Sequence, residues 1–113
     1  MRKLLLALPL LAAVVIAGCV GQSNTTPPLS TSTSLKIENF AFVPSEITIL
    51  KGTTLTWTNL DDTQHTVTSD DGKFDSGQLG KGQTFIFAFE ETGTFNYHCG
   101  NHLNMKATVI VVE

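Results

Sequence analysis

Residues 97–105, YHCGNHLNM, concentrate side chains that bind soft metal ions. The segment holds one cysteine, two histidines and one methionine. Thiolate, imidazole and thioether groups are good ligands for late transition metals. Cys99, His102 and Met105 follow one another at intervals of three residues, so a short loop can fold all three donors around one point. The segment therefore predicts a metal-binding loop.

The residues before Cys99 alternate in the manner of a β-strand. Neighbouring side chains of a strand point to opposite faces. Phe95, Tyr97 and Cys99 share one face, and the two aromatic rings indicate that it is the buried one. His98 then lies on the solvated face and should not bind a metal together with Cys99. We expect His98 to be a solvated strand residue that could at most offer a secondary route to the metal.

A further donor must come from elsewhere in the chain. His65 follows the turn-like sequence NLDDTQ, and if strands 53–59 and 94–98 run in the same direction, it lies beside Cys99. The predicted ligands are then His65, Cys99, His102 and Met105. One thiolate, two imidazoles and one thioether form the ligand set of a mononuclear blue-copper electron-transfer site. We predict one copper ion per chain, cycling between Cu(I) and Cu(II).

Several other interpretations of these residues remain open. Zinc accepts cysteine and histidine but has little use for methionine. Cys99 and His65 could instead form a nucleophile and base, although no orienting residue or oxyanion hole is evident. The same donors would serve a copper carrier that delivers the ion to an exported oxidase. Met105 could fill the core, and the domain could be a metal-free adhesive lipoprotein.

The segments around these donors predict an all-β domain. Short alternating stretches are separated by Gly, Asp and Asn, and none shows a helical period. In the stretch 83–90, Phe85, Phe87 and Phe89 fall on one face. The expected strands cover residues 35–42, 46–50, 54–59, 65–69, 83–90, 93–99 and 107–113. About seven or eight strands in residues 35–113 predict a Greek-key β-sandwich.

The N-terminus resembles an export signal. Two basic residues precede an apolar run that is too short for a comfortable membrane span. The run ends in IAGC, which resembles the lipobox of exported lipoproteins and implies cleavage after residues 1–18 with lipid attached to Cys19. Ordinary cleavage near the same place is the alternative. With Cys19 lipidated, Cys99 has no disulfide partner, and metal binding gives it a role.

Residues 19–34 predict a flexible tether between this anchor and the domain. They are rich in Ser, Thr and Pro, and the fifteen residues after Cys19 would reach roughly 20 Å. Five basic against ten acidic residues in 19–113 give this part of the chain a net charge of −5. An acidic chain with no basic run disfavours nucleic acid. We expect an exported protein at the periplasmic or extracytoplasmic face of a membrane.

The whole domain resembles the cupredoxins. YHCGNHLNM is similar to their ligand loop, with the spacing of the amicyanin branch, and FAFVPSEITILKGTTLTWTNLDDTQHTV resembles the sequence that leads to their first histidine. The resemblance implies that the backbone N–H of Thr66 donates to the Cys99 sulfur. It also implies that the exposed edge of His102 is the electron port and Leu103 part of an apolar docking rim. The implied partners are redox proteins, such as a membrane respiratory complex or an exported oxidoreductase.

Two positions depart from the family pattern. Phe95 stands where the family usually has a tyrosine whose hydroxyl ties a corner. Gly100 and Asn101 replace a usual Thr-Pro, so we expect a less rigid loop. Asp61 and Asp62 lie in the loop before His65 and could steer a basic partner or serve only the turn. Glu90 and Glu91 are expected at the opposite end of the domain.

Overall fold

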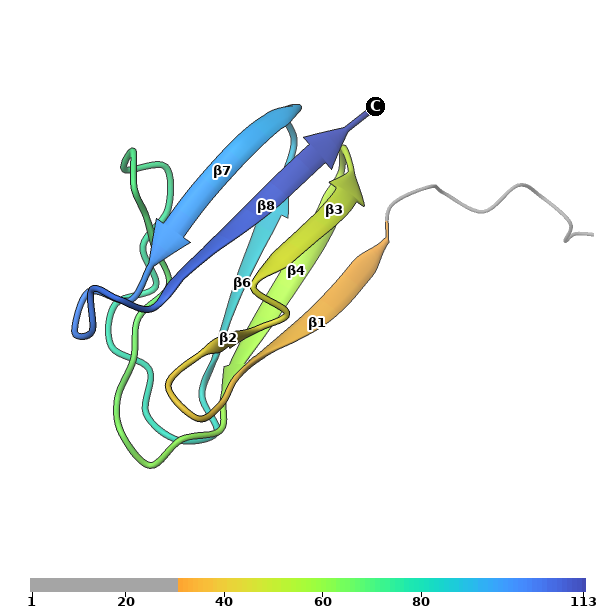
Figure 1. The fold of residues 1–113 in the computed structure, drawn as a ribbon. Coiled ribbons are helices and arrows are strands. Elements are labelled where there is room, and N and C mark those ends of the chain that lie inside the picture. Colours follow the sequence, from red (N-terminus) through yellow and green to blue (C-terminus); the bar gives the residue numbers. More distant parts are fainter. Residues whose placement is uncertain (1–30) are drawn as a thin grey trace, which may run out of the picture.

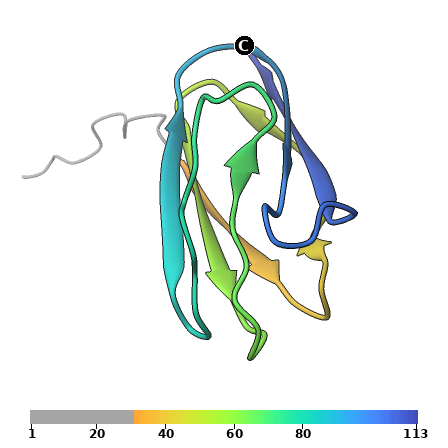
Figure 2. The same cartoon turned by 90° about the vertical axis from the view of Figure 1, so that its left-hand side faces the viewer.

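The computed structural model describes residues 31–113, which form two β-sheets packed face to face (Figures 1 and 2). The strands are β1 (Ser32–Ile37), β2 (Phe42–Val43), β3 (Glu46–Leu50), β4 (Thr53–Asn59), β5 (Thr68–Ser69), β6 (Thr84–Phe89), β7 (Gly93–His98) and β8 (Lys106–Val112). One sheet has the order β2-β1-β4-β6 and the other β3-β8-β7-β5. Both mix parallel and antiparallel pairs. The predicted all-β sandwich is confirmed.

The alternation of side chains explains how the two sheets share one core. Along β4 every second residue is buried, and Leu55 and Trp57 are completely inaccessible to solvent. β6 turns Phe89 inward and leaves Ile86 61% exposed on its outer face. The Trp57 Nε1–H donates to the hydroxyl of Tyr97, 3.1 Å away, which joins the two sheets inside the core. A buried indole N–H needs such a partner, so this bond fixes one arrangement of the aromatic residues.

The first strand begins earlier than expected. β1 starts at Ser32, inside the segment 19–34 that the sequence assigns to the tether, and pairs in parallel with β4 from Ser32↔Thr54 onward. The hydroxyl groups of Thr31 and Thr53 are also hydrogen-bonded at 2.9 Å. Small polar residues fit here because the partner strand satisfies their backbone groups, whatever their side chains.

Two expected strands are shorter in the structure. The stretch 35–42 is broken after Ile37 by a turn in which Asn39 and Phe40 have positive φ, before β2 begins. The stretch 65–69 forms a strand only at β5, because His65 exchanges backbone hydrogen bonds with Leu79 instead of with a long strand. Both interruptions lie at the end of the sandwich where the predicted ligands gather.

Strand direction brings the ligand-bearing loops to one end of the domain. β4 and β7 point toward the same end in Figure 1, so the loop after β4 and the loop between β7 and β8 lie side by side there. Glu90 and Glu91 precede β7 and therefore lie at the opposite end, as predicted. The prediction that His65 lies beside Cys99 required these two strands to run in the same direction, and they do.

The predicted signal segment, Cys19 and most of the predicted tether lie outside the described residues. Within residues 31–113 there is no helix with the length and apolar character required to cross a membrane.

Candidate metal centre

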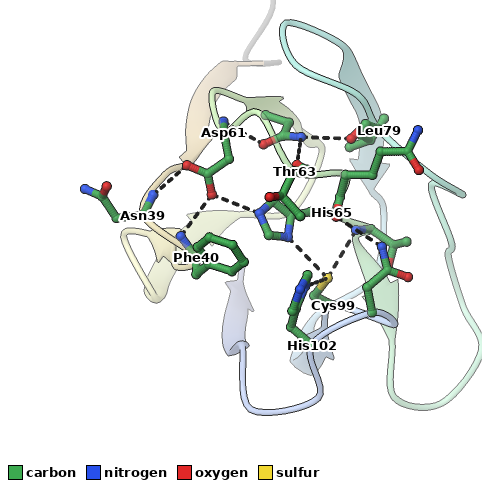
Figure 3. Close-up of polar contacts among 12 residues, drawn as sticks. Asn39, Phe40, Asp61, Thr63, His65, Leu79, Cys99 and His102 are labelled. Atoms are coloured by element: carbon green, nitrogen blue, oxygen red, sulfur yellow. Dashed lines mark hydrogen bonds and ion pairs between the residues drawn. The ribbon is translucent and has the colours of Figure 1, made fainter.

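Three potential ligand atoms converge at this end of the sandwich (Figure 3). The Sγ of Cys99 lies 3.6 Å from the Nδ1 of His65 and 3.6 Å from the Nδ1 of His102. All three atoms lie within 4.8 Å of one another. Cys99 and His65 are completely buried, whereas His102 is partly exposed. The loop after β4 and the loop after β7 thus supply donors to a single point.

These distances fit a shared metal ion. In protein sites a metal–sulfur bond of about 2.3 Å and a metal–imidazole bond of about 2.0–2.1 Å are typical, as zinc shows. With angles of about 110–120° between these bonds, sulfur and nitrogen lie about 3.6–3.8 Å apart. The two observed sulfur–nitrogen distances of 3.6 Å fall in this range. The donor chemistry, one thiolate with two imidazoles, suits copper.

Hydrogen bonding alone explains the cluster less well. A neutral thiol can donate to one imidazole nitrogen, and it can accept from the other only weakly, because sulfur is a poor acceptor. Two imidazole nitrogens nevertheless point at the Cys99 sulfur at equal distance. A metal ion can bond all three atoms at once. Cys99 is a free thiol, so it is available for this role.

Met105 follows His102 at the end of the same loop, just before β8. Its side chain is buried, with 4% of its surface exposed. The backbone of Met105 accepts a hydrogen bond from the Cys99 N–H at 3.1 Å and donates one to the His102 carbonyl at 2.8 Å. These two bonds close the loop and hold the backbone of Cys99, His102 and Met105 together.

Thr66 shapes the surroundings of the sulfur. Its backbone N–H donates to the Cys99 Sγ over 3.4 Å. Its hydroxyl accepts a hydrogen bond from the Gly100 N–H at 2.7 Å and is bonded to the Thr68 hydroxyl at 2.8 Å. Thr66 therefore touches both the sulfur and the loop that carries it. A donor aimed at the sulfur stabilises negative charge there.

Asp61 anchors the other nitrogen of the His65 ring. Its Oδ2 lies 2.8 Å from the His65 Nε2, and its two oxygens accept hydrogen bonds from the backbone N–H groups of Asn39 and Phe40. Burial raises the pKa of Asp61, but these hydrogen bonds outweigh it and hold the pKa below its ordinary value. An ionised carboxylate only accepts, so the His65 proton belongs on Nε2 and the Nδ1 lone pair faces Cys99.

The loop that carries His102 is held by polar contacts at its surface. The Asn101 side chain donates to the Gln64 carbonyl at 3.1 Å and to the Gln78 side chain at 2.7 Å. The expected looser loop at Gly100 and Asn101 is thus tied to the neighbouring loops at both residues. Leu103 is 67% exposed at the tip.

His98 does not join the cluster. Its Nδ1 is hydrogen-bonded to the Asp70 carboxylate at 2.6 Å, on the face of β7 opposite the core. The side chain of His98 is 25% exposed and that of Asp70 55%. The alternation of the strand therefore separates His98 from Cys99, as the sequence predicts.

A family model described as a cupredoxin-like domain matches residues 9–111. The chain belongs to this family.

Curated relatives of this cupredoxin include an amicyanin and a plastocyanin. It is 32% identical over 120 residues to amicyanin-alpha of Methylorubrum extorquens, covering 98% of this chain and 99% of the relative. It is 30% identical over 83 residues to plastocyanin of Scenedesmus fuscus, covering 62% of this chain and 85% of the relative. The similarity to amicyanin-alpha thus runs along almost the whole of both chains.

Solved structures of amicyanin have the same fold. An amicyanin variant in a reduced Cu(I) form at pH 4 aligns with a TM-score of 0.66 and 27% identity, covering 72% of this chain and 82% of the other. A second reduced amicyanin variant also aligns with a TM-score of 0.66, at 26% identity and the same coverage.

The sequence did not reveal three residues that support this cupredoxin centre. The Phe40 ring lies edge-on to both imidazoles, with centroids 5.1 Å from His65 and 5.0 Å from His102. Asn59 is completely buried, and its side chain donates to two loop carbonyls and accepts from the Asp61 N–H. For Asp61 the sequence predicts only a role in the turn or a charge that steers a partner. Its spacing of four residues before His65 was the one available signal.

The neighbouring acidic residue behaves differently. Asp62 is 89% exposed and pairs with Lys81 at 3.0 Å. Only 14% of the Asp61 side chain is exposed. Its oxygens are hydrogen-bonded to His65 and to the backbone of the turn at Asn39 and Phe40. Of the two, only Asp62 presents its charge to solvent and to an approaching partner.

Proposed function

We propose that the protein carries single electrons through one copper ion held by His65, Cys99, His102 and Met105. The observation that carries this proposal is the pair of 3.6 Å distances from both imidazole Nδ1 atoms to one buried sulfur. A copper ion bound by these donors supplies one-electron chemistry by alternating between Cu(I) and Cu(II). The relationship to amicyanin-alpha supports the same function.

The protein's part is to hold the donors in one arrangement during electron transfer. The buried side chains of His65 and Cys99 leave little room for the ligands to rearrange. The Thr66 N–H donates to the sulfur and balances part of its negative charge. The thioether of Met105 is proposed as the weak axial ligand that helps to set the reduction potential.

Electrons are proposed to enter and leave through the ring of His102. It is the one partly exposed member of the three-atom cluster. Leu103 follows it with 67% of its surface exposed and would form part of an apolar docking rim. The partners would be redox proteins, with a membrane respiratory complex and an exported oxidoreductase as candidate classes.

The burial of the site favours an electron carrier over the two alternatives. A copper carrier must let a recipient's ligand reach the ion, and a cysteine nucleophile must meet its substrate. The Cys99 sulfur and the His65 ring have no solvent-exposed surface. Slow loss of copper to an external chelator over many redox cycles would support the electron carrier, and rapid loss would favour copper delivery.

We propose that the domain is tethered to a membrane through lipid on Cys19. The support is the export-signal pattern of residues 1–18 and the Ser/Thr/Pro-rich composition of the residues that follow. Replacing Cys19→Ser in the full chain should move the protein from the membrane fraction to the soluble fraction. Equal membrane association of both forms would contradict lipid anchoring without affecting the copper proposal.

The optical spectrum of the Cu(II) protein tests the copper proposal. Charge transfer from the Cys99 thiolate should give an intense visible colour, and Cys99→Ser should abolish it. His98→Ala is the matched control, because it changes the adjacent histidine, which faces Asp70, and should leave the colour intact. A Cu(II) form without this band, or one with equal colour after Cys99→Ser, would rule out the proposed centre.

The axial role of Met105 has a separate test. Met105→Leu keeps a buried apolar side chain but removes the sulfur, so the colour should persist while the reduction potential rises. Loss of a weak donor destabilises Cu(II) more than Cu(I), which gives the direction of this shift. An unchanged potential would show that Met105 only fills the core.

A further inference from the structure

The turn before β2 has a backbone conformation that its own sequence does not favour. Asn39 and Phe40 are consecutive non-glycine residues with φ of 56° and 58°. Asparagine tolerates this region, but a bulky aromatic residue rarely adopts it. Such a strained conformation persists only where the surrounding structure compensates for it.

The Asp61 carboxylate provides this compensation. Its Oδ1 accepts the Asn39 N–H at 2.8 Å, and its Oδ2 accepts the Phe40 N–H at 2.9 Å. Successive backbone N–H groups that converge in this way form a nest for an anion. The partner comes from a loop more than twenty residues farther along the chain. The turn is thus held by a contact that only the folded protein can make.

The same carboxylate reaches the metal centre. Its Oδ2 is shared between the Phe40 N–H and the His65 Nε2, 2.8 Å away (Figure 3). The nest fixes the carboxylate, and the carboxylate fixes the plane and tautomer of the His65 ring. A carboxylate that accepts from a metal-binding histidine also makes the imidazole a stronger donor.

The aromatic ring of Phe40 packs against the rings of both His65 and His102. Held by its N–H, its ring lies nearly perpendicular to the rings of His65 and His102, at interplanar angles of 87° and 89°. The Phe40 ring contacts both imidazoles, although 49% of the residue's surface remains exposed. One aromatic ring therefore restricts both histidines, and the position of that ring depends on Asp61.

We propose that Asp61 and Phe40 form a clamp that orients both histidines and stabilises the oxidised centre. Asp61 and Phe40 are positioning residues: they act through His65 and His102. The negative charge and the stronger donation through His65 favour Cu(II) over Cu(I). This inference rests on the proposed copper function, since it assigns the control of that centre to a network outside its ligands.

The main test is the reduction potential of the copper-loaded protein. Asp61→Asn removes the charge with little change in size and should shift the reduction equilibrium toward Cu(I) by tenfold or more. For a one-electron couple, tenfold corresponds to a rise of about 59 mV. Asp62→Asn removes an equal charge from the adjacent, exposed carboxylate and should shift the equilibrium less than twofold. Equal shifts in the two variants would overturn the clamp.

Phe40→Leu tests the aromatic half of the clamp. The variant keeps an apolar side chain at the turn but removes the edge contacts with both imidazoles. We expect slower electron transfer. Without the Phe40 ring, the rings of His65 and His102 have more room to reorient when the charge of the copper ion changes. The electron self-exchange rate should fall at least threefold at an unchanged copper content. An unchanged rate would remove Phe40 from the clamp.

Measurements on the unaltered chain keep the inference testable if the variants fold poorly. In the metal-free protein, nitrogen NMR should find the His65 proton on Nε2, and the amide protons of Asn39 and Phe40 should be protected from exchange. Rapid exchange of both amides, or a proton on Nδ1, would overturn the clamp. These measurements need no copper, so they also separate failure of the clamp from failure of the proposed function.

Discussion

The two loops that supply the metal centre are built in different ways. The loop after β4 buries His65 completely and fixes it with side chains inside the protein, above all Asn59 and Asp61. The loop after β7 leaves His102 partly exposed and closes mainly through backbone bonds between Cys99 and Met105. One loop is suited to holding a ligand still, and the other to presenting a ligand at the surface.

An electron carrier gains from this division. Little reorganisation of the ligands requires at least one immobile side, whereas transfer to another protein requires a short path to the surface. If both loops resembled the first, the copper would be insulated from its partners. If both resembled the second, the ligands would be free to change their arrangement with each change of charge. The predictions below test the difference between the two loops, beginning with the largest expected effect.

Asn59→Ala should cost the most stability. The Asn59 side chain donates to the Leu79 carbonyl at 2.8 Å and the Thr63 carbonyl at 3.0 Å, and it accepts from the Asp61 N–H at 3.0 Å. Its removal leaves these groups without a partner, so we expect a loss of about 3–5 kcal/mol in the free energy of unfolding. Denaturant unfolding of the metal-free protein measures it. A loss below about 1 kcal/mol would show that the first loop is not held from within.

Asn59 also shows which parts of this centre could be predicted from the sequence and which could not. The approach of His102 to Cys99 could be predicted because the chemistry and spacing of these two residues are local. His65 was predicted beside Cys99 only on the condition that β4 and β7 run in the same direction, which alternation within each strand does not determine and which the fold shows to be true. The support from Asn59 could not be predicted, because a buried asparagine before a loop looks like an ordinary turn residue until its distant partners are known.

The fold divides in the same way. The long strand β4 was predicted because its apolar residues alternate with threonines, and in the structure buried positions alternate with partly buried ones along it. The positive φ of Phe40 gave no local signal, since its compensation comes from Asp61, 21 residues later. The early start of β1 at Ser32 was likewise hidden, because its polar residues are ordered by pairing with β4.

Alkaline pH should weaken the core beneath the buried loop. Burial raises the pKa of Tyr97 to about 12, against the opposing effect of the hydrogen bond from Trp57. An unfolded tyrosine ionises near 10, so the unfolded chain loses its proton first, and stability falls as the pH rises from about 10 to 12. The total loss from this group is about 2–3 kcal/mol.

The ionisation can be followed without interference from other tyrosines. Tyr97 is the one tyrosine in the chain, so tyrosinate absorbance reports it alone. Ionisation should begin only as the protein unfolds, and Tyr97→Phe should remove this part of the pH dependence at some cost in stability at neutral pH. Ionisation near pH 10 in the folded protein would contradict the burial argument.

Asn101→Ala provides the counterpart in the exposed loop. Its side chain bonds the Gln64 carbonyl and the Gln78 amide, but the contacts are exposed to water, which can replace them. We expect a loss of less than about 1 kcal/mol in the free energy of unfolding. The same substitution, Asn to Ala, thus separates the two loops by several-fold. A loss as large as that of Asn59→Ala would remove the contrast between them.

Leu103→Lys should have almost no effect on stability and should act on encounters between molecules. Leu103 is 67% exposed beside His102, so its replacement disturbs no core packing, and we expect a change within about 0.5 kcal/mol. A charge on the proposed docking rim should slow electron self-exchange between Cu(I) and Cu(II) molecules, because two copies must bring their His102 edges together. NMR line broadening of mixed samples measures this rate. Lys at the similarly exposed Ile86, on the outer face of β6, is the matched control and should leave the rate unchanged. Equal slowing by both substitutions would mean that net charge governs the encounter. It would also mean that electrons do not pass preferentially through the loop that carries His102 and Leu103.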